Sequence, residues 1–337
     1  QMVRHGKTIE DAREGGASGC VETGAFGREA YFLTGYFNLT KILELTLHNG
    51  TDPFSGEQVG IQTGDPKTFD SFDGLMNAFE KQLNHFIDIK IRGNNMIESF
   101  YAKNMPAPFM SLLIDDCIEN GKDYNAGGAR YNTSYIQGVG IGTITDTLSS
   151  IRKHVYDDKR LTMEALLKIL ADNFIGHEET WELFKNQTPK YGNDDDYADT
   201  IATAVFEIFF KAVDGRPNFR GGYHRINLLP TTVHVYFGSV LGALADGKKA
   251  GEPISEGISP VQGTDRMGPT SVIKSAAKLD HLRTGGTLLN QKFTPEFFED
   301  EESIAKLAQF VRTYFRLDGH HIQFNVVNSE LLREAQK

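Results

Sequence analysis

The segment GGASGCVETGAFG, residues 15–27, is the most informative part of this sequence. It places Cys20 two residues before Glu22 in a stretch built almost wholly from glycine, alanine, serine and threonine. In an extended loop, residues i and i+2 project on the same side, so the thiol and the carboxylate are expected to face neighbouring atoms of one substrate. The flanking glycines leave space for a ligand or for another backbone segment to come close.

The pairing of these two side chains restricts the chemistry. A random Cys-x-Glu is usually a small buried thiol beside an unrelated surface carboxylate. A carboxylate this near disfavours an ionised thiol, whereas a cysteine nucleophile needs a histidine or a helix N-terminus. The pair therefore favours chemistry in which the sulfur of Cys20 reacts without ionising. Hydrogen-atom transfer by a sulfur radical is such chemistry, with Glu22 free to move protons.

Composition excludes several classes of protein. The chain has 337 residues and a net charge of -10, and its lysines and arginines form no block, so we predict neither a nucleic-acid nor a membrane partner. Two cysteines in a chain of this length indicate a reducing compartment, and we predict a cytoplasmic location. The first residues lack the apolar segment of a signal peptide.

Hydrophobic periodicity predicts helices alternating with short strands, which favours one layered or barrel-like α/β domain. The apolar segment 108–114 is expected to be buried. Helices are predicted in seven places: after an N-cap at Asn38, from about Ser71 to Pro106, from near Asp146, after an N-cap at Thr162, from near Asp194, within 269–280, and after Asn328. Strands are predicted in three runs: 223–238, 287–293 and 320–327.

The rest of the sequence gives no evidence for a nucleotide-binding turn, a calcium loop, another metal site or a serine hydrolase. GVGIGT at 138–143 lacks the third glycine of a dinucleotide-binding turn, and the acidic residues 194–196 suit a helix N-terminus rather than a calcium loop. His320 and His321 are adjacent, so on a strand they point to opposite faces and cannot hold one ion; we predict no metal site. The chain has no GxSxG nucleophile elbow.

The segment GCVETG resembles the Cys-x-Glu loop of glycyl radical enzymes of the dehydratase and lyase type. The resemblance extends along the chain in family order. The similar segments are DDCIENGKDYNAGGARYN, KYGNDDDYAD, SEGISPVQGTDRMGPTSVIKSAAKLDH, GGTLLNQKFTP and GHHIQFNVV. Relatives acting on glycerol, propane-1,2-diol or choline usually carry Cys-Val-Glu-Pro at this loop. Thr23 therefore favours the branch that dehydrates trans-4-hydroxy-L-proline.

The resemblance implies a fold, a source for the radical and roles for four residues. The fold is the C-terminal half of a ten-stranded α/β barrel of the pyruvate formate-lyase-like type, with Cys20 on a loop entering the barrel. No cofactor binds directly; an activating enzyme with S-adenosylmethionine and an iron-sulfur cluster places a radical on a backbone glycine. Cys20 would then carry the thiyl radical and Glu22 would move protons as water leaves to give 1-pyrroline-5-carboxylate. Tyr36 and Thr231 would bind substrate, although Tyr36 could equally be a packed core aromatic.

The family's Arg-Val-x-Gly-Tyr segment does not occur in these residues. We therefore expect residues 1–337 to be a partial barrel domain that lacks the N-terminal half and the glycyl radical loop, inactive alone and a homodimer when complete. Three alternatives stay open: a sister enzyme acting on glycerol, propane-1,2-diol or choline, a truncated, non-catalytic structural or interaction protein, and a thiol hydrolase with Cys20 as the nucleophile.

Overall fold

The computed structural model describes residues 1–336. The strands of these residues are β1 (Gly16–Ala17), β2 (Thr23–Gly24), β3 (Glu29–Asn38), β4 (Tyr131–Val139), β5 (Tyr223–Asn227), β6 (Leu289–Phe293) and β7 (Ile322–Val326). The α-helices are α1 (Ile9–Arg13), α2 (Leu39–Leu47), α3 (Phe72–Asn104), α4 (Pro108–Leu112), α5 (Asp115–Glu119), α6 (Ile141–Ile151), α7 (Met163–Ala171), α8 (Glu178–Asn186), α9 (Asp196–Val213), α10 (Val233–Ser239), α11 (Pro269–Ala277), α12 (Glu301–Arg316) and α13 (Ser329–Ala335).

The longer strands form a parallel array. β4 lies between β3 and β5 and is parallel to both. Beyond β5 the array continues through a parallel bridge between Leu228 and Thr287, and the chain after Thr287 becomes β6, which pairs in parallel with β7. The predicted α/β fold is thereby confirmed. Closure of this array into a ten-stranded barrel stays a prediction.

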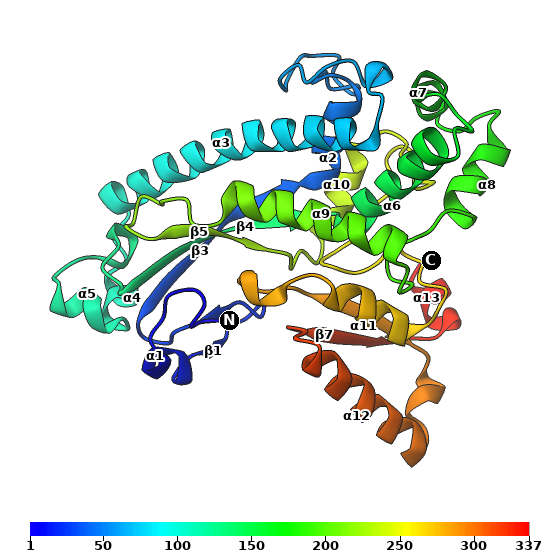
Figure 1. The fold of residues 1–337 in the computed structure, drawn as a ribbon. Helices are drawn as coiled ribbons and strands as arrows, with labels where there is room; N and C mark the ends of the chain where they lie inside the picture. The colour runs from blue at the N-terminus through cyan, green and yellow to red at the C-terminus, as the bar shows by residue number, and fades with distance from the viewer. Residues whose placement is uncertain (337) are drawn as a thin grey trace.

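Helices α2, α3, α6 and α9 cover one face of the sheet formed by β3, β4 and β5 (Figure 1). The strands turn apolar side chains to this face, and Phe37 of β3 stacks on Phe209 of α9 with 5.8 Å between ring centroids. Ile136 and Ile226 of the next two strands are fully buried in the same core. Burial of this apolar layer holds the sheet against the helices. The opposite face of the sheet is not covered by these four helices, and the Cys20 segment lies on that side.

Helix starts agree with the predicted caps. The side chains of Asn38 and Thr162 accept hydrogen bonds from the backbone N–H groups of the third residues after them, and Asp195 caps α9. The acidic cluster is thus a helix N-terminus, as expected. No helix of the residues described is long and apolar enough to cross a membrane.

Three local predictions were wrong. α6 begins at Ile141 rather than near Asp146, because Gly140, at φ 92°, turns the chain from β4 directly into the helix. The β-branched run after Thr231 forms helix α10 and not a strand. The segment 108–114 begins with the short helix α4 and is largely exposed, with Phe109 at 72%.

Asp146 of α6 is a buried carboxyl whose ionisation opposes folding. It accepts a hydrogen bond of 2.8 Å from the Tyr191 backbone N–H, and burial raises its pKa to about 7. The folded protein therefore holds a proton near pH 5 to 6 that the unfolded chain has released. Stability from this group is full below about pH 4 and is lost as the pH rises through about 7.

We expect the free energy of unfolding to fall between pH 5 and pH 8 by ~3 kcal/mol on account of Asp146. In Asp146→Asn this part of the pH dependence should vanish, because asparagine has no proton to lose. Urea unfolding at the two pH values measures the difference, with the exposed Asp73→Asn as control. An equal fall in the Asp146→Asn protein would contradict the prediction.

Candidate active site

Cys20 lies at the tip of a β-hairpin. β1 and β2 pair antiparallel, with Gly16 opposite Gly24. Between them the N–H of Ser18 donates to the carbonyl of Glu22 at 2.8 Å, and the N–H of Val21 donates to the carbonyl of Ser18 at 2.8 Å. The expected extended loop is therefore wrong for residues 18–21, which form a turn. Cys20 is exposed at its apex, whereas Glu22 is buried.

Val21 holds an unusual backbone conformation. Its φ is 73°, in the left-handed region that a β-branched residue rarely adopts. Such a conformation costs of order 1–3 kcal/mol and persists only where neighbouring contacts impose it. The turn that carries Cys20 is thus held in place from outside.

Two contacts from the C-terminal part of the chain hold the hairpin. The N–H of Thr23 donates to the carbonyl of Gly285 at 3.2 Å, and Nε2 of His320 lies 2.7 Å from the carbonyl oxygen of Val21. Gly285 itself lies against the sheet: a Cβ there would be 2.1 Å from Cε1 of Tyr135 and 2.3 Å from Oδ1 of Asn227. Only glycine fits between the hairpin and these two buried side chains.

The sheet face beneath the hairpin is polar. Strand register aligns Tyr36 with Gln137 and Gln137 with Asn227, so these three side chains share one face. Tyr135 and Asn227 are almost fully buried. Their hydroxyl and amide groups find no hydrogen-bond partner within residues 1–336. This is the face on which Gly285 and the hairpin rest.

Glu22 has few partners. It is 6% exposed, and the hydroxyl of Ser18 donates to its Oε2 at 3.5 Å. Burial raises the pKa of the neighbouring Tyr31, and the charge of Glu22 raises it further against the opposing hydrogen bond from Ser18. Burial lowers the pKa of His320, while its bond to the Val21 carbonyl and the charge of Glu22 oppose this. Glu22 is therefore a buried carboxyl group close to an imidazole whose protonated form burial disfavours.

The base of the hairpin rests on a buried ion pair. Nζ of Lys7 lies 3.0 Å from Oε1 of Glu29, with both side chains at most 2% exposed. Glu29 also accepts hydrogen bonds from the N–H of Ala25 at 2.9 Å and from the hydroxyl of Thr133 at 2.8 Å. The carboxylate thus joins the end of the hairpin to β3 and β4.

We expect Lys7→Met to lower the free energy of unfolding by about 3–5 kcal/mol, because the Glu29 carboxylate would stay buried without its cation. Adding Glu29→Gln should recover part of this loss, since the amide oxygen can still accept from the Ala25 N–H and the amide NH2 group can donate to the Thr133 hydroxyl oxygen. Chemical denaturation of the single and double variants measures both effects. Equal stability of wild type and Lys7→Met would show that the pair contributes nothing.

The structure places the two predicted substrate residues at the carboxyl end of the parallel strands. Tyr36 follows a β-bulge in β3 and is 43% exposed, so it is not a packed core aromatic. Thr231 is exposed in a bend between β5 and α10; its predicted position on a barrel strand is wrong, because the strand ends at Asn227. No hydrogen bond joins either residue to Cys20 within the described residues.

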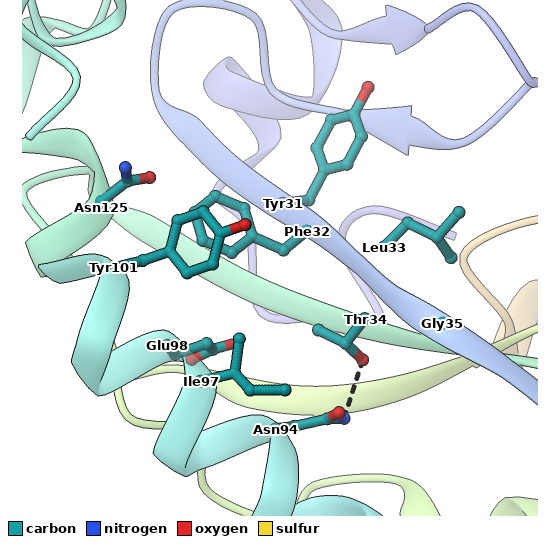
Figure 2. Close-up of a pocket in the computed structure, with 10 residues that line it drawn as sticks. All are labelled: Tyr31, Phe32, Leu33, Thr34, Gly35, Asn94, Ile97, Glu98, Tyr101 and Asn125. Carbon is teal, nitrogen blue, oxygen red and sulfur yellow. Dashed lines mark hydrogen bonds between the residues drawn. The ribbon is translucent and has the colours of Figure 1, made fainter. Parts of the chain in front are cut away.

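A cavity of about 640 Å³ lies elsewhere, between β3 and α3. Figure 2 shows its lining, with Asn94 of α3 donating to the Thr34 hydroxyl of β3 at 2.8 Å. Tyr31 points away from this cavity toward the hairpin, on the other side of β3 from Phe32 (Figure 2). None of the four predicted site residues lines it, so the cavity is separate from the hairpin.

Sequence reasoning missed the residues that hold the hairpin. His320 was considered only as a metal ligand, and Gly285 only as part of a family segment. The doubled glycine before β6 was the available signal, since paired glycines mark a close approach of backbone. Within residues 1–336 no three His, Cys, Asp or Glu side chains gather as a metal site.

Comparison with known proteins identifies two family regions. Residues 1–238 match the pyruvate formate lyase-like family, and residues 254–337 match the glycine radical family. The hairpin belongs to the first region, and Gly285 and His320 belong to the second. The contact between His320 and Val21 therefore joins the two.

The chain is 58% identical over 337 residues to trans-4-hydroxy-L-proline dehydratase of Clostridioides difficile, covering 100% of this chain and 43% of that protein. Its fold matches the crystal structure of the Clostridioides difficile hydroxyproline dehydratase with trans-4-hydroxy-L-proline bound, with a TM-score of 0.98 over 99% of this chain and 42% of that one.

The fold also matches the glycerol-bound, B12-independent glycerol dehydratase of Clostridium butyricum, with 39% identity and a TM-score of 0.95 over 99% of this chain and 42% of that one. The chain thus spans less than half the length of the proteins it matches. The family matches, the fold and the Cys20 hairpin all lead to the same assignment. The chain belongs to the pyruvate formate lyase-like family of glycyl radical enzymes.

Proposed function

We propose that the complete protein is a radical dehydratase that removes water from trans-4-hydroxy-L-proline to give 1-pyrroline-5-carboxylate. The observation that carries the proposal is the hairpin: an exposed thiol at its apex and a buried carboxyl group two residues on, in a chain that is 58% identical to a dehydratase of this substrate. Thr23 follows Glu22, where relatives that act on diols or choline usually carry proline, and this favours the hydroxyproline branch.

The site suits hydrogen-atom transfer better than nucleophilic attack. The Cys20 side chain makes no hydrogen bond within the described residues, and the one nearby histidine, His320, directs Nε2 to a backbone carbonyl instead. The thiol therefore has no base to ionise it. A glycyl radical, installed by an activating enzyme that uses S-adenosylmethionine and an iron-sulfur cluster, would supply the unpaired electron to the Cys20 sulfur.

The residues of this chain would then act in sequence. The Cys20 sulfur takes a hydrogen atom from ring carbon 5, beside the nitrogen, which forms an S–H bond and leaves a carbon radical. The bond between carbon 4 and its hydroxyl breaks as Glu22 donates a proton to make water, and Glu22 regains a proton from the ring nitrogen. Cys20 returns its hydrogen atom to carbon 4, which leaves the C=N bond of the product. We propose that the side chains of Tyr36 and Thr231 contact the bound substrate.

To test this, the activated, complete protein is incubated separately with trans-4-hydroxy-L-proline, glycerol, propane-1,2-diol and choline. The products are identified by mass spectrometry. We expect 1-pyrroline-5-carboxylate from the first and no turnover of the others. Preferred turnover of a diol or of choline would assign the protein to a sister activity. With the glycyl radical present, no turnover of any of the four would favour a non-catalytic role.

The proposal includes one protein partner and one assembly. The activating enzyme must meet the complete protein for the radical to form, and we propose a homodimer. Analytical ultracentrifugation of the complete protein tests the second point, with a monomer as the contradicting result.

A further inference from the structure

Among the backbone groups of the turn at residues 18–21, the Val21 carbonyl is the one with a partner from a distant part of the described chain. The hydrogen bonds of Ser18 and Val21 N–H are internal to the turn, and that of Thr23 belongs to β2. Val21 adopts its left-handed φ of 73° one residue after Cys20. Rotation about the Val21 backbone would release this strain and move Cys20, so the contact at its carbonyl decides where the thiol lies.

His320 meets the Val21 carbonyl with a defined donor. The carbonyl oxygen can only accept a hydrogen bond, so Nε2 of His320 carries the hydrogen. The distance of 2.7 Å is short for an N–H donor, and the imidazole is half-buried. A buried bond of this kind is costly to leave unmade.

The glycine at position 286 leaves room for the hydrogen bond between His320 and the Val21 carbonyl. A Cβ at Gly286 would lie 3.1 Å from Nε2 of His320 and 3.2 Å from the Val21 oxygen, so a side chain there would crowd both partners. Gly286 follows Gly285, which receives the Thr23 N–H at 3.2 Å. The doubled glycine and the histidine therefore form one support behind the turn.

We propose that His320 is a positioning residue: its Nε2–H holds the Val21 carbonyl and thereby fixes the turn that presents the Cys20 thiol. The proposal rests on the proposed radical function for its effect on turnover, but the conformational effect stands without it. His320 reaches the reacting atoms only through the backbone and is not itself catalytic. The adjacent His321 has no such bond to the hairpin, and it supplies the matched control.

Three variants of the complete protein test the proposal: His320→Ala, His320→Gln and His321→Ala. Glutamine places an N–H donor close to the position of Nε2, so it should restore the bond. The first measurement is hydrogen–deuterium exchange of the peptide spanning residues 18–24, without the radical. We expect exchange roughly tenfold faster in His320→Ala, and near wild type in the other two.

The second measurement is turnover at equal glycyl radical content, determined by electron paramagnetic resonance. We expect His320→Ala to lose ~10²-fold in kcat, and His320→Gln to recover at least ~10-fold of that loss. Unchanged exchange in His320→Ala, a glutamine variant no better than alanine, or faster exchange in α9 as well as in the hairpin would each overturn the proposal. Failure of the wild-type protein to dehydrate hydroxyproline would instead refute the proposed function, while the exchange result still decides the role of His320.

Discussion

We expect turnover to fall to background when Cys20 is replaced by alanine in the complete, activated protein, while the glycyl radical signal persists. Alanine keeps the backbone of the turn but removes the only atom that can take and return a hydrogen atom. Cys20 is exposed at the apex and its side chain makes no hydrogen bond within residues 1–336, so the substitution should leave the stability unchanged. Thermal unfolding and electron paramagnetic resonance control for folding and activation.

Glu22→Gln is expected to separate hydrogen-atom transfer by Cys20 from the loss of water. Glutamine cannot move a proton, so we expect turnover to fall by ~10²–10⁴-fold while Cys20 still exchanges hydrogen with the substrate. In deuterated water, recovered substrate should therefore gain deuterium at carbon 5 without losing its hydroxyl. Full activity in either the Cys20 or the Glu22 variant would refute the mechanism.

Gly285→Ala is expected to lower both the stability and the turnover of the protein. The new methyl group would lie 2.1 Å from Cε1 of Tyr135 and 2.3 Å from Oδ1 of Asn227, and both side chains are buried in the sheet face. The backbone at residue 285 must therefore move away, which breaks its bond to the Thr23 N–H. We expect a loss of about 1–3 kcal/mol in unfolding free energy and of ~10²-fold or more in kcat.

Gly93→Ala is the matched control for Gly285→Ala. No atom lies within 4 Å of a Cβ placed at Gly93, in the middle of α3. Alanine there should raise stability by up to ~1 kcal/mol, because it favours the helix. Equal behaviour of the two variants in urea unfolding and in turnover would show that the close approach at Gly285 has no consequence.

The sequence predicted those features that depend on neighbouring residues. Caps at Asn38 and Thr162 were predicted correctly because a capping side chain binds a backbone N–H only a few residues away. β7 likewise lies within the predicted run 320–327, although the expected alternation breaks at its end, where Val326 is 43% exposed. The α/β fold class followed from the order of such elements.

Features that depend on distant contacts were not predictable in this way. The run after Thr231 is rich in valine and aromatic residues, which favour strands, yet it forms α10 where Val233 and Phe237 pack on a small core with Ile254. The turn at Cys20 was expected to be extended, because nothing near it in the sequence indicates that His320 holds the next carbonyl. The family resemblance identified Cys20 and Glu22 as the pair of interest but gave no account of what supports them.

The bond between Val21 and His320 spans 299 residues of chain, and this has a consequence for biosynthesis. At roughly 5–20 residues per second, the ribosome needs on the order of 15–60 s to add that length after the hairpin has emerged. Throughout this interval the turn lacks its support, and its strained backbone is free to relax. The reactive cysteine therefore reaches its working geometry only after synthesis of the distal segment. Ordering of the hairpin should be among the last events of folding.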